Sequence, residues 1–185
     1  MNTAALQKPE LVREASRAFG SSTIVISIEA ANRLNGSYEC YTDNGRARTG
    51  VDVLEWAKRA EGMGAGEIMI TSIAQEGTGK GFDLALTQKV SESVQIPVIA
   101  SGGAGKLGHL GDVLRQGKAD AVALASMLHY RILRDADKKS PVFTEGNTNF
   151  FETGEGYSRV HEVTIGEVKK YLIGEGLLKK ELAAR

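Results

Sequence analysis

The sequence predicts an α/β protein with a parallel sheet, and three observations support this fold class. Four short apolar segments rich in β-branched residues are each separated from the next by sequence with helical periodicity. Nearly continuous apolar strands of this kind are typical of sheets buried on both faces. The 185 residues are 42% hydrophobic and 25% charged, which suffices for one core of ordinary size. We therefore expect βα units joined by right-handed crossovers.

The expected elements alternate along the first two thirds of the chain. Pro9 opens a helix over 9–19 that stops before Gly20. A strand over 22–28 follows and ends at Glu29. Asn44-Gly45 then predicts a hairpin within 37–49 that leaves the main body. The remaining expected elements are helices over 54–63, 84–94 and 107–116 and strands over 67–73, 97–101 and 121–126.

The C-terminal part of the sequence changes character. Beyond Tyr130 the periodicity is lost, and we interpret residues 133–162 as an irregular insertion with too many aromatic residues for a disordered linker. A capping box, Thr164 with Glu167, lies between Val163 and Val168 in the positions of a hydrophobic staple. It predicts a helix over 165–173. The division is then 1–132, 133–162 and a C-terminal helical segment, 163–185.

Charge and composition exclude several classes of partner. Lys+Arg 23 balance Asp+Glu 23, so no basic surface for nucleic acid or an anionic membrane is expected. The sequence has no apolar run as long as a membrane span and no signal-peptide pattern at its start, which favours a cytoplasmic protein. Cys40 is the only cysteine, and the histidines lack metal-ligand spacing, so we expect neither a metal nor a cofactor.

Glycines gather after the expected strands, where ligands bind in parallel α/β folds. Their N–H groups can approach an anion closely, and the helix expected from Leu107 would add its positive end. The pattern indicates a phosphate site; a tight turn without a ligand is the alternative. The candidate residues are Glu76, Gly77 and Thr78 after one strand, Ser101, Gly102 and Gly103 after the next, and Ala125 and Ser126 after the last.

Glu29 is the best candidate for acid–base chemistry. A carboxylate at a partly desolvated strand end can have its pKa raised toward neutrality. The alternative is a surface carboxylate paired with Arg33. The histidines His109, His129 and His161 are interpreted as structural or solvated, with His109 on the outer face of its helix.

Several strings occur in a characteristic order: Asn2-Thr3-Ala4-Ala5, Ile28-Glu29-Ala30, Gly64-Ala65-Gly66-Glu67, Thr71-Ser72-Ile73, Glu76-Gly77-Thr78 with Asp83, Ile99 to Gly105, and Ala123 to Ser126. Together they resemble the C-terminal half of the cyclase subunit of imidazole glycerol phosphate synthase. The resemblance covers residues 2–132 and resumes over 163–172. It implies that 1–132 form a parallel (βα)4 half-barrel, one half of a TIM-type (β/α)8 barrel.

The resemblance also implies an activity in histidine biosynthesis. The family uses ammonia from a glutaminase subunit to form imidazole glycerol phosphate and aminoimidazole carboxamide ribonucleotide. Its phosphorylated ribosyl substrate carries two phosphates, one for each half-barrel. By position, Gly77, Gly103, Ala125 and Ser126, with Ser101 beside them, would hold one phosphate, and Asn2 and Thr3 match part of the other phosphate site.

The sequence departs from the family pattern at three points. Glu29 stands where the family has a catalytic Asp, and a displacement of about 1 Å can lower the rate on the order of 100-fold. Ala74 stands where an acidic residue is usual. The family's N-terminal half, with its other catalytic Asp, has no counterpart in this sequence.

A half-barrel by itself leaves open sheet edges and an uncovered inner face. We therefore expect a C2 homodimer, or a larger assembly of such pairs, that completes eight strands and sets the two copies of Glu29 opposite each other. Three interpretations stay open: a cyclase-like lyase, a catalytically silent half-barrel that binds phosphorylated metabolites or inorganic phosphate, and a fragment that folds only with a separate N-terminal half.

Overall fold

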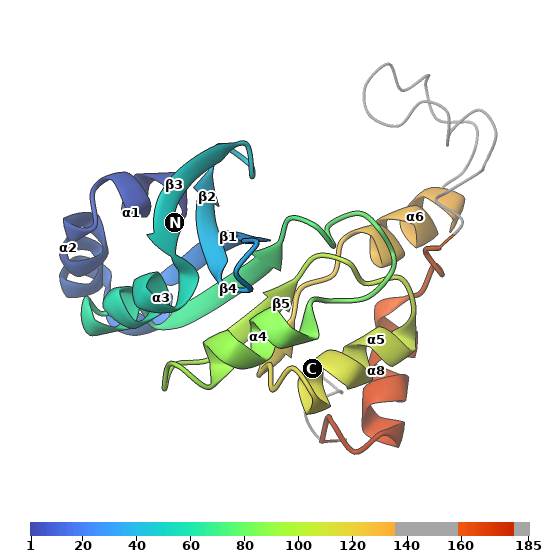
Figure 1. Ribbon diagram of the computed structural model, residues 1–185. Coiled ribbons are helices and arrows are strands. Elements are labelled where there is room, and N and C mark those ends of the chain that lie inside the picture. Colours follow the sequence, from blue (N-terminus) through green and yellow to red (C-terminus); the bar gives the residue numbers. More distant parts are fainter. Residues whose placement is uncertain (136–158, 180–185) are drawn as a thin grey trace, which may run out of the picture.

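One six-stranded sheet organises the protein (Figure 1). The computed structural model describes residues 1–135 and 159–179. In sheet order β3-β2-β1-β4-β5-β6, the strands are β3 (Ala47–Asp52), β2 (Tyr38–Thr42), β1 (Val25–Asn32), β4 (Glu67–Ser72), β5 (Val98–Ser101) and β6 (Ala121–Val122). The α-helices are α1 (Thr3–Gln7), α2 (Glu10–Phe19), α3 (Val53–Gly62), α4 (Leu84–Ser91), α5 (Leu107–Arg115), α6 (Ser126–Asp135) and α8 (Ile165–Gly174).

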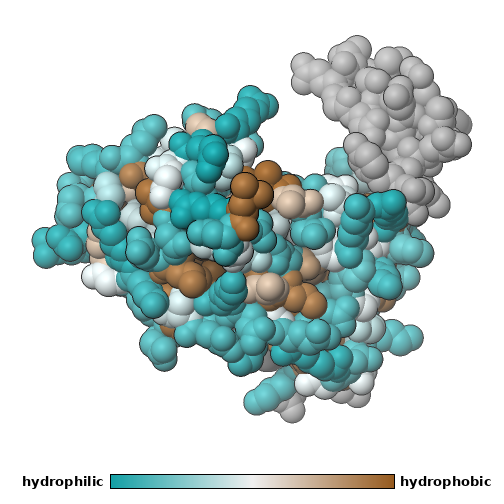
Figure 2. Space-filling model, in the orientation of Figure 1, coloured by the Kyte–Doolittle hydropathy of each residue, from teal (hydrophilic) through white to brown (hydrophobic). Residues whose placement is uncertain are grey.

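The parallel part of the sheet consists of β1, β4, β5 and β6, and helices cover one of its sides. α3, α4 and α5 follow one another along this side (Figure 1). Ile26 and Ile28 of β1 and Ile68 and Ile70 of β4 point toward the helices and are at most 1% exposed. Each such side chain contributes about 1.5–3 kcal/mol by leaving water. The side of the molecule seen in Figure 2 is mainly hydrophilic, with separate hydrophobic patches.

Among the described residues, no helical layer covers the opposite side of the parallel strands. Val25 and Ser27 of β1, Met69 of β4 and Ile99 of β5 alternate with the helix-facing residues and are only half-buried. None of them belongs to the two hydrophobic clusters formed by the described residues. In a complete barrel this side would be the interior, so we call it the inner face.

The predicted hairpin is confirmed, but its expected departure from the main body is wrong. β2 pairs antiparallel with the end of β1, from Glu29 opposite Tyr41 to Asn32 opposite Tyr38. Asp43, Asn44 and Gly45 form the turn with φ of 55°, 56° and 74°. Asn and Gly accept this left-handed conformation more readily than other residues. The hairpin therefore extends the sheet beyond β1.

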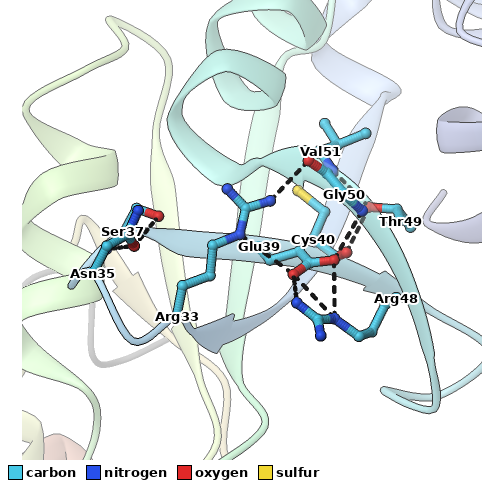
Figure 3. A network of polar contacts seen from close by, with 9 residues as sticks. All are labelled: Arg33, Asn35, Ser37, Glu39, Cys40, Arg48, Thr49, Gly50 and Val51. Carbon is cyan, nitrogen blue, oxygen red and sulfur yellow. Dashed lines mark hydrogen bonds and ion pairs between the residues drawn. The ribbon is translucent and has the colours of Figure 1, made fainter.

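A buried carboxylate on β2 forms hydrogen bonds that join the two strands of the hairpin (Figure 3). Glu39 of β2 is 2% exposed and lies between Arg48, 2.7 Å from its Oε2, and Arg33, at 3.3 Å. The Gly50 N–H donates to Glu39 Oε1 at 2.8 Å, and Arg33 donates to the Gly50 carbonyl. Hydrogen bonds from Arg48 and Gly50 lower the pKa of Glu39 to about 2 despite its burial. Glu39 is therefore ionised at neutral pH.

The first half of β1 has a different neighbour. The Met1 amino group donates to the Val25 carbonyl at 2.7 Å, and the Ser27 N–H donates to the Met1 carbonyl at 2.8 Å. In a parallel ladder, one residue forms hydrogen bonds to the residues before and after its partner on the neighbouring strand, as Met1 does here with Val25 and Ser27. Met1 thus lies beside Ile26 as a single parallel bridge.

Most predicted elements lie within a few residues of the observed ones, and the largest error is near the C-terminus. The expected strand over 121–126 is only Ala121–Val122, and the periodicity does not stop at Tyr130, because residues Ser126–Asp135 form α6. Residues 133–135 of the predicted insertion therefore belong to α6, and its residues 136–158 lie outside the described parts. The capping box of α8 is confirmed.

Candidate functional site

Three side chains form a row where the parallel strands end. Glu29 of β1 is in register with Thr71 of β4, which is in register with Ser101 of β5. Neighbouring strands lie roughly 4.8 Å apart, so Glu29 and Ser101 are separated by about 10 Å across the sheet. The prediction that this strand ends at Glu29 is wrong. β1 continues to Asn32 because β2 pairs with this extension.

A pocket of about 160 Å³ lies beside this row, at the ends of β5 and β6. It brings together the predicted residues of three loops that are distant in sequence. The predicted residues that line it are Glu76, Gly77, Ser101, Gly102, Gly103, Ala125 and Ser126. Among the described residues that line the pocket, Glu76 alone is charged, and it is exposed.

Glycine is required in the loops around the pocket for two physical reasons. Gly77, Gly102 and Gly103 have φ of 71°, 85° and 102°, a region that other residues rarely adopt. A Cβ on Gly103 would also overlap the Gly81 carbonyl oxygen, because the Gly81 N–H donates to the Gly103 carbonyl at 2.7 Å. The loops after β4 and β5 are thus packed backbone against backbone.

The helix whose N-terminus borders the pocket is α6, not the predicted helix from Leu107. Ser126 and Met127 are the first two residues of α6, and both line the pocket. The first N–H groups of an α-helix have no partner within the helix, and its dipole makes this end positive. The pocket thus offers main-chain donors, the Ser101 and Ser126 hydroxyl groups and a helix N-terminus, which together suit a phosphate.

The carboxylate of Glu29 is held by neutral donors. Its Oε2 accepts from Asn2 Nδ2 at 3.0 Å and from the Gly45 N–H of the hairpin turn at 2.8 Å. Within the described ranges its Oε1 has no hydrogen-bond partner. The alternative partner, Arg33, instead contacts Glu39, so the ion-pair interpretation of Glu29 is wrong. One carboxylate oxygen therefore remains for a ligand.

The structure does not bring every predicted residue to the pocket. The Thr78 hydroxyl donates to the Gln75 carbonyl at 2.7 Å and so closes its own turn. Asn2 lies against Glu29, and Thr3 Oγ1 accepts from the Asp43 N–H at 3.3 Å. Asn2 Oδ1 is buried and finds no donor among the described residues. Asn2 and Thr3 thus belong to the Glu29 end of the row.

Sequence reasoning missed part of the pocket wall. The missed lining residues are Gly79, Ala104, Ala123, Leu124, Met127 and Val160. Gly79 and Ala104 adjoin predicted glycine strings, so a wider window around those strings would have included them. Val160 carried no local signal, because its place depends on a chain segment that returns from far along the sequence.

Cys40 was assigned no role, and its surroundings agree with an inert thiol. It lies on β2 and is fully buried. Burial, together with the negative charge of Asp52, raises the pKa of Cys40 to about 12. The thiol is therefore uncharged at neutral pH and a poor nucleophile.

A parallel βα sheet with glycine loops and a helix N-terminus gathered at its strand ends defines a partial barrel of the TIM type. Residues 1–134 match the family model described as "Histidine biosynthesis protein", and the chain belongs to that family. The family has the TIM-barrel fold, which agrees with the partial barrel observed. In the described part of the chain, no helix is both long enough and apolar enough to span a membrane.

Proposed function

We propose that this protein binds a phosphorylated ribosyl metabolite and acts on it as a cyclase-type lyase of histidine biosynthesis, with Glu29 as general acid–base. The observation that carries the proposal is the pocket of about 160 Å³ at the ends of β5 and β6, on the same row of strand ends as Glu29. A binding site for a whole metabolite usually measures about 300–1,000 Å³. The pocket is therefore of a size for one terminal group of the substrate, and its donors favour a phosphate.

The distance between pocket and carboxylate supports the same proposal. With a phosphate in the pocket, the rest of the ligand would extend along the row from Ser101 toward Glu29, about 10 Å away across two strand spacings. A ribose and its attached base can cover such a distance. Glu29 Oε1 would then be free to exchange a proton with the reacting ring, while Asn2 and Gly45 hold Oε2.

Turnover of the imidazole-precursor ribonucleotide with ammonium as nitrogen donor tests this proposal. Wild type, Glu29→Gln and Glu29→Asp would be compared, the last restoring the residue usual in the family. Removal of the acid–base group should lower kcat by at least about 100-fold without weakening phosphate binding. Glu29→Asp keeps an acid–base group and should therefore turn over faster than Glu29→Gln, even if the shorter side chain lowers the rate below that of wild type.

Two results would contradict the acid–base role. Equal turnover by wild type and Glu29→Gln would remove Glu29 from the chemistry. Tight binding of phosphate without turnover in any variant would instead support the second candidate, a catalytically silent module that binds phosphorylated metabolites. The phosphate pocket is the observation that favours this second candidate, because its geometry does not depend on Glu29.

We further propose that a second copy of the chain covers the inner face and completes the barrel. Val25, Met69 and Ile99 are half-buried there, and no described residues form a layer over them. Among the described residues, β6 pairs only with β5, so its other edge is open. Light scattering at micromolar concentration should give at least twice the 19.8 kDa of one chain. A mass of one chain would exclude self-assembly and favour a separate chain as the cover.

A further inference from the structure

The loop after β5 is held from two directions at Gly105. The Gly105 N–H donates to Nδ1 of His109, in the first turn of α5, at 3.2 Å. The Gly105 carbonyl accepts from the His161 N–H at 2.7 Å. Gly105 itself is buried, and a Cβ there would overlap the Gly79 carbonyl. This residue is thus a fixed point of the same loop that supplies Ser101 to Ala104 to the pocket.

The His109 ring faces this loop, although the sequence analysis placed His109 on the outer face of its helix as a structural or solvated residue. A Cβ on Gly81 would lie 3.5 Å from the ring, and Gly81 bonds to Gly103 of the pocket. Among the described residues, the titratable groups around the ring are Lys106 and Asp112 from its own chain segment and His161 from the returning segment. Burial, followed by Lys106, lowers the pKa of His109, whereas Asp112 opposes this shift. His109 is therefore neutral at pH 7.

We propose that His109 is a positioning residue whose neutral imidazole holds the loop of residues 101–105 in the conformation that binds a phosphate group. The inference rests on the proposed phosphate site and adds its regulation: binding weakens when His109 takes up a proton. Neutral imidazole has one acceptor nitrogen, and in this protein Nδ1 fills that role toward Gly105. Both nitrogens of the imidazolium form are donors.

Protonation would therefore set an N–H of His109 against the N–H of Gly105. The buried Gly105 N–H would lose its acceptor, and leaving such a donor unsatisfied costs about 1–3 kcal/mol. Movement of the loop toward water relieves that cost. Gly103 and Ala104 would then leave their places in the pocket wall, because they lie directly before Gly105.

A purely structural role is the alternative, since His109 accepts at the start of α5 in the manner of a helix cap. Such a role would affect stability but would not make anion affinity depend on pH through this side chain. Two substitutions separate the roles. Asn in His109→Asn carries Oδ1 where the ring has Nδ1 and cannot titrate, whereas His109→Leu has no acceptor.

The experiment measures sulfate affinity by calorimetry from about pH 8 to about pH 5.5, around the ordinary pKa of histidine. Sulfate has the shape of phosphate and stays a dianion over this range, so only the protein titrates. Wild type should lose affinity on the order of threefold to tenfold toward low pH, the value of one hydrogen bond. His109→Asn should bind nearly as wild type does at pH 8 and show little loss. His109→Leu should be weak throughout.

Three outcomes would overturn the inference in distinguishable ways. Absence of sulfate binding to wild type at pH 8 would remove the phosphate site itself and with it this regulation. Equal pH dependence of wild type and His109→Asn would leave the phosphate site intact but assign the titration to His161 or another group. Tighter binding by wild type at low pH would show that imidazolium charge outweighs the loss of the Gly105 contact.

Discussion

At the scale of single residues, two glutamates on adjacent strands have opposite surroundings. In the described part of the chain, Glu29 of β1 receives hydrogen bonds only from neutral donors, whereas Glu39 of β2 is buried between Arg33 and Arg48. The first arrangement leaves Oε1 of Glu29 for a ligand, whereas both carboxylate oxygens of Glu39 already accept hydrogen bonds. Their burial and partners assign a candidate chemical role to Glu29 and a structural role to Glu39.

The pH dependence of stability should reveal the role of Glu39. The pKa of Glu39 falls from an ordinary 4.5 to about 2 in the folded protein, so the unfolded chain binds more protons between these values. The contribution of this carboxylate is present above about pH 4.5 and is lost as pH falls through about 2. Glu39→Gln should be less stable than wild type at pH 7, and the difference should shrink in acid.

Urea unfolding of both proteins between pH 7 and the lowest pH at which they stay folded measures this effect. Glu10→Gln, on the exposed surface of α2, is the matched control, because its partner Arg13 lies in solvent. An unchanged difference between wild type and Glu39→Gln down to about pH 3 would contradict the assigned pKa.

A pair of glycines tests the packing of the pocket loops. Gly103→Ala would place a Cβ against the Gly81 carbonyl at a φ of 102°, which should cost about 1–3 kcal/mol of unfolding free energy. Gly108→Ala, in the first turn of α5, meets nothing within 4 Å and should be stabilising by up to about 1 kcal/mol. Chemical denaturation gives both values, and equal effects would exclude the packing argument.

Residue types and their order predicted much of the candidate site, but not its contacts. The glycine strings and Ser126 indicated the pocket because strand ends converge in any parallel sheet. One of the two donors to Glu29 is the main-chain N–H of Gly45, and every residue except proline carries such a group, so no side-chain pattern could reveal it. Arg33 was paired with Glu29 because the two are close in sequence, whereas the hairpin brings Glu39 nearer.

At the scale of elements, α6 shows where periodicity was insufficient. The mixed polarity of His129, Tyr130 and Arg131 in this helix hides the helical spacing. In addition, the strand expected over 121–126 included Ser126, which is the first residue of α6. The two elements with explicit local signals were predicted correctly. Asn44-Gly45 forms the hairpin turn, and the capping box begins α8. Local turn and capping signals therefore located these two features more precisely than hydrophobic spacing located α6.

The cap of α8 gives an element-scale prediction. Thr164 Oγ1 accepts from the Glu167 N–H at 3.2 Å, and Glu167 Oε2 accepts from the Thr164 N–H at 2.7 Å. Thr164→Ala removes the first bond and should lower the unfolding free energy by about 1 kcal/mol, whereas Thr164→Ser should retain it. Thermal unfolding of the three proteins measures the difference, and similar losses for Ala and Ser would contradict a capping role.

At the scale of the whole molecule, the inner face is the side of the sheet that no layer of described residues covers. The helix-covered side contains the two hydrophobic clusters, and the inner face lies outside both. The proposed second copy would supply the missing layer and would place a second pocket across the strand ends. Such a site would hold a ligand with a phosphate at each end, as the family resemblance implies.

A single charge on the inner face should separate the copies. Met69→Glu would bury a carboxylate in the proposed interface, so we expect the mass in light scattering to fall to that of one chain. Leu34→Glu, at a fully exposed site, is the matched control and should leave the mass unchanged. If Met69→Glu keeps the mass of wild type while circular dichroism shows the same fold, the interface lies elsewhere.

The attachment of the hairpin to β1 also bears on the order of folding. Parallel β1 and β4 can pair only after the chain has closed a long crossover, which slows folding. The meander of β1, β2 and β3 needs only short turns, and hairpins form within about 1–10 μs. Amides of residues 29–32 and of Tyr38–Thr42 should therefore gain protection from hydrogen exchange before those of Val98–Ser101. A sheet that is mainly parallel in its final form would thus begin from an antiparallel nucleus.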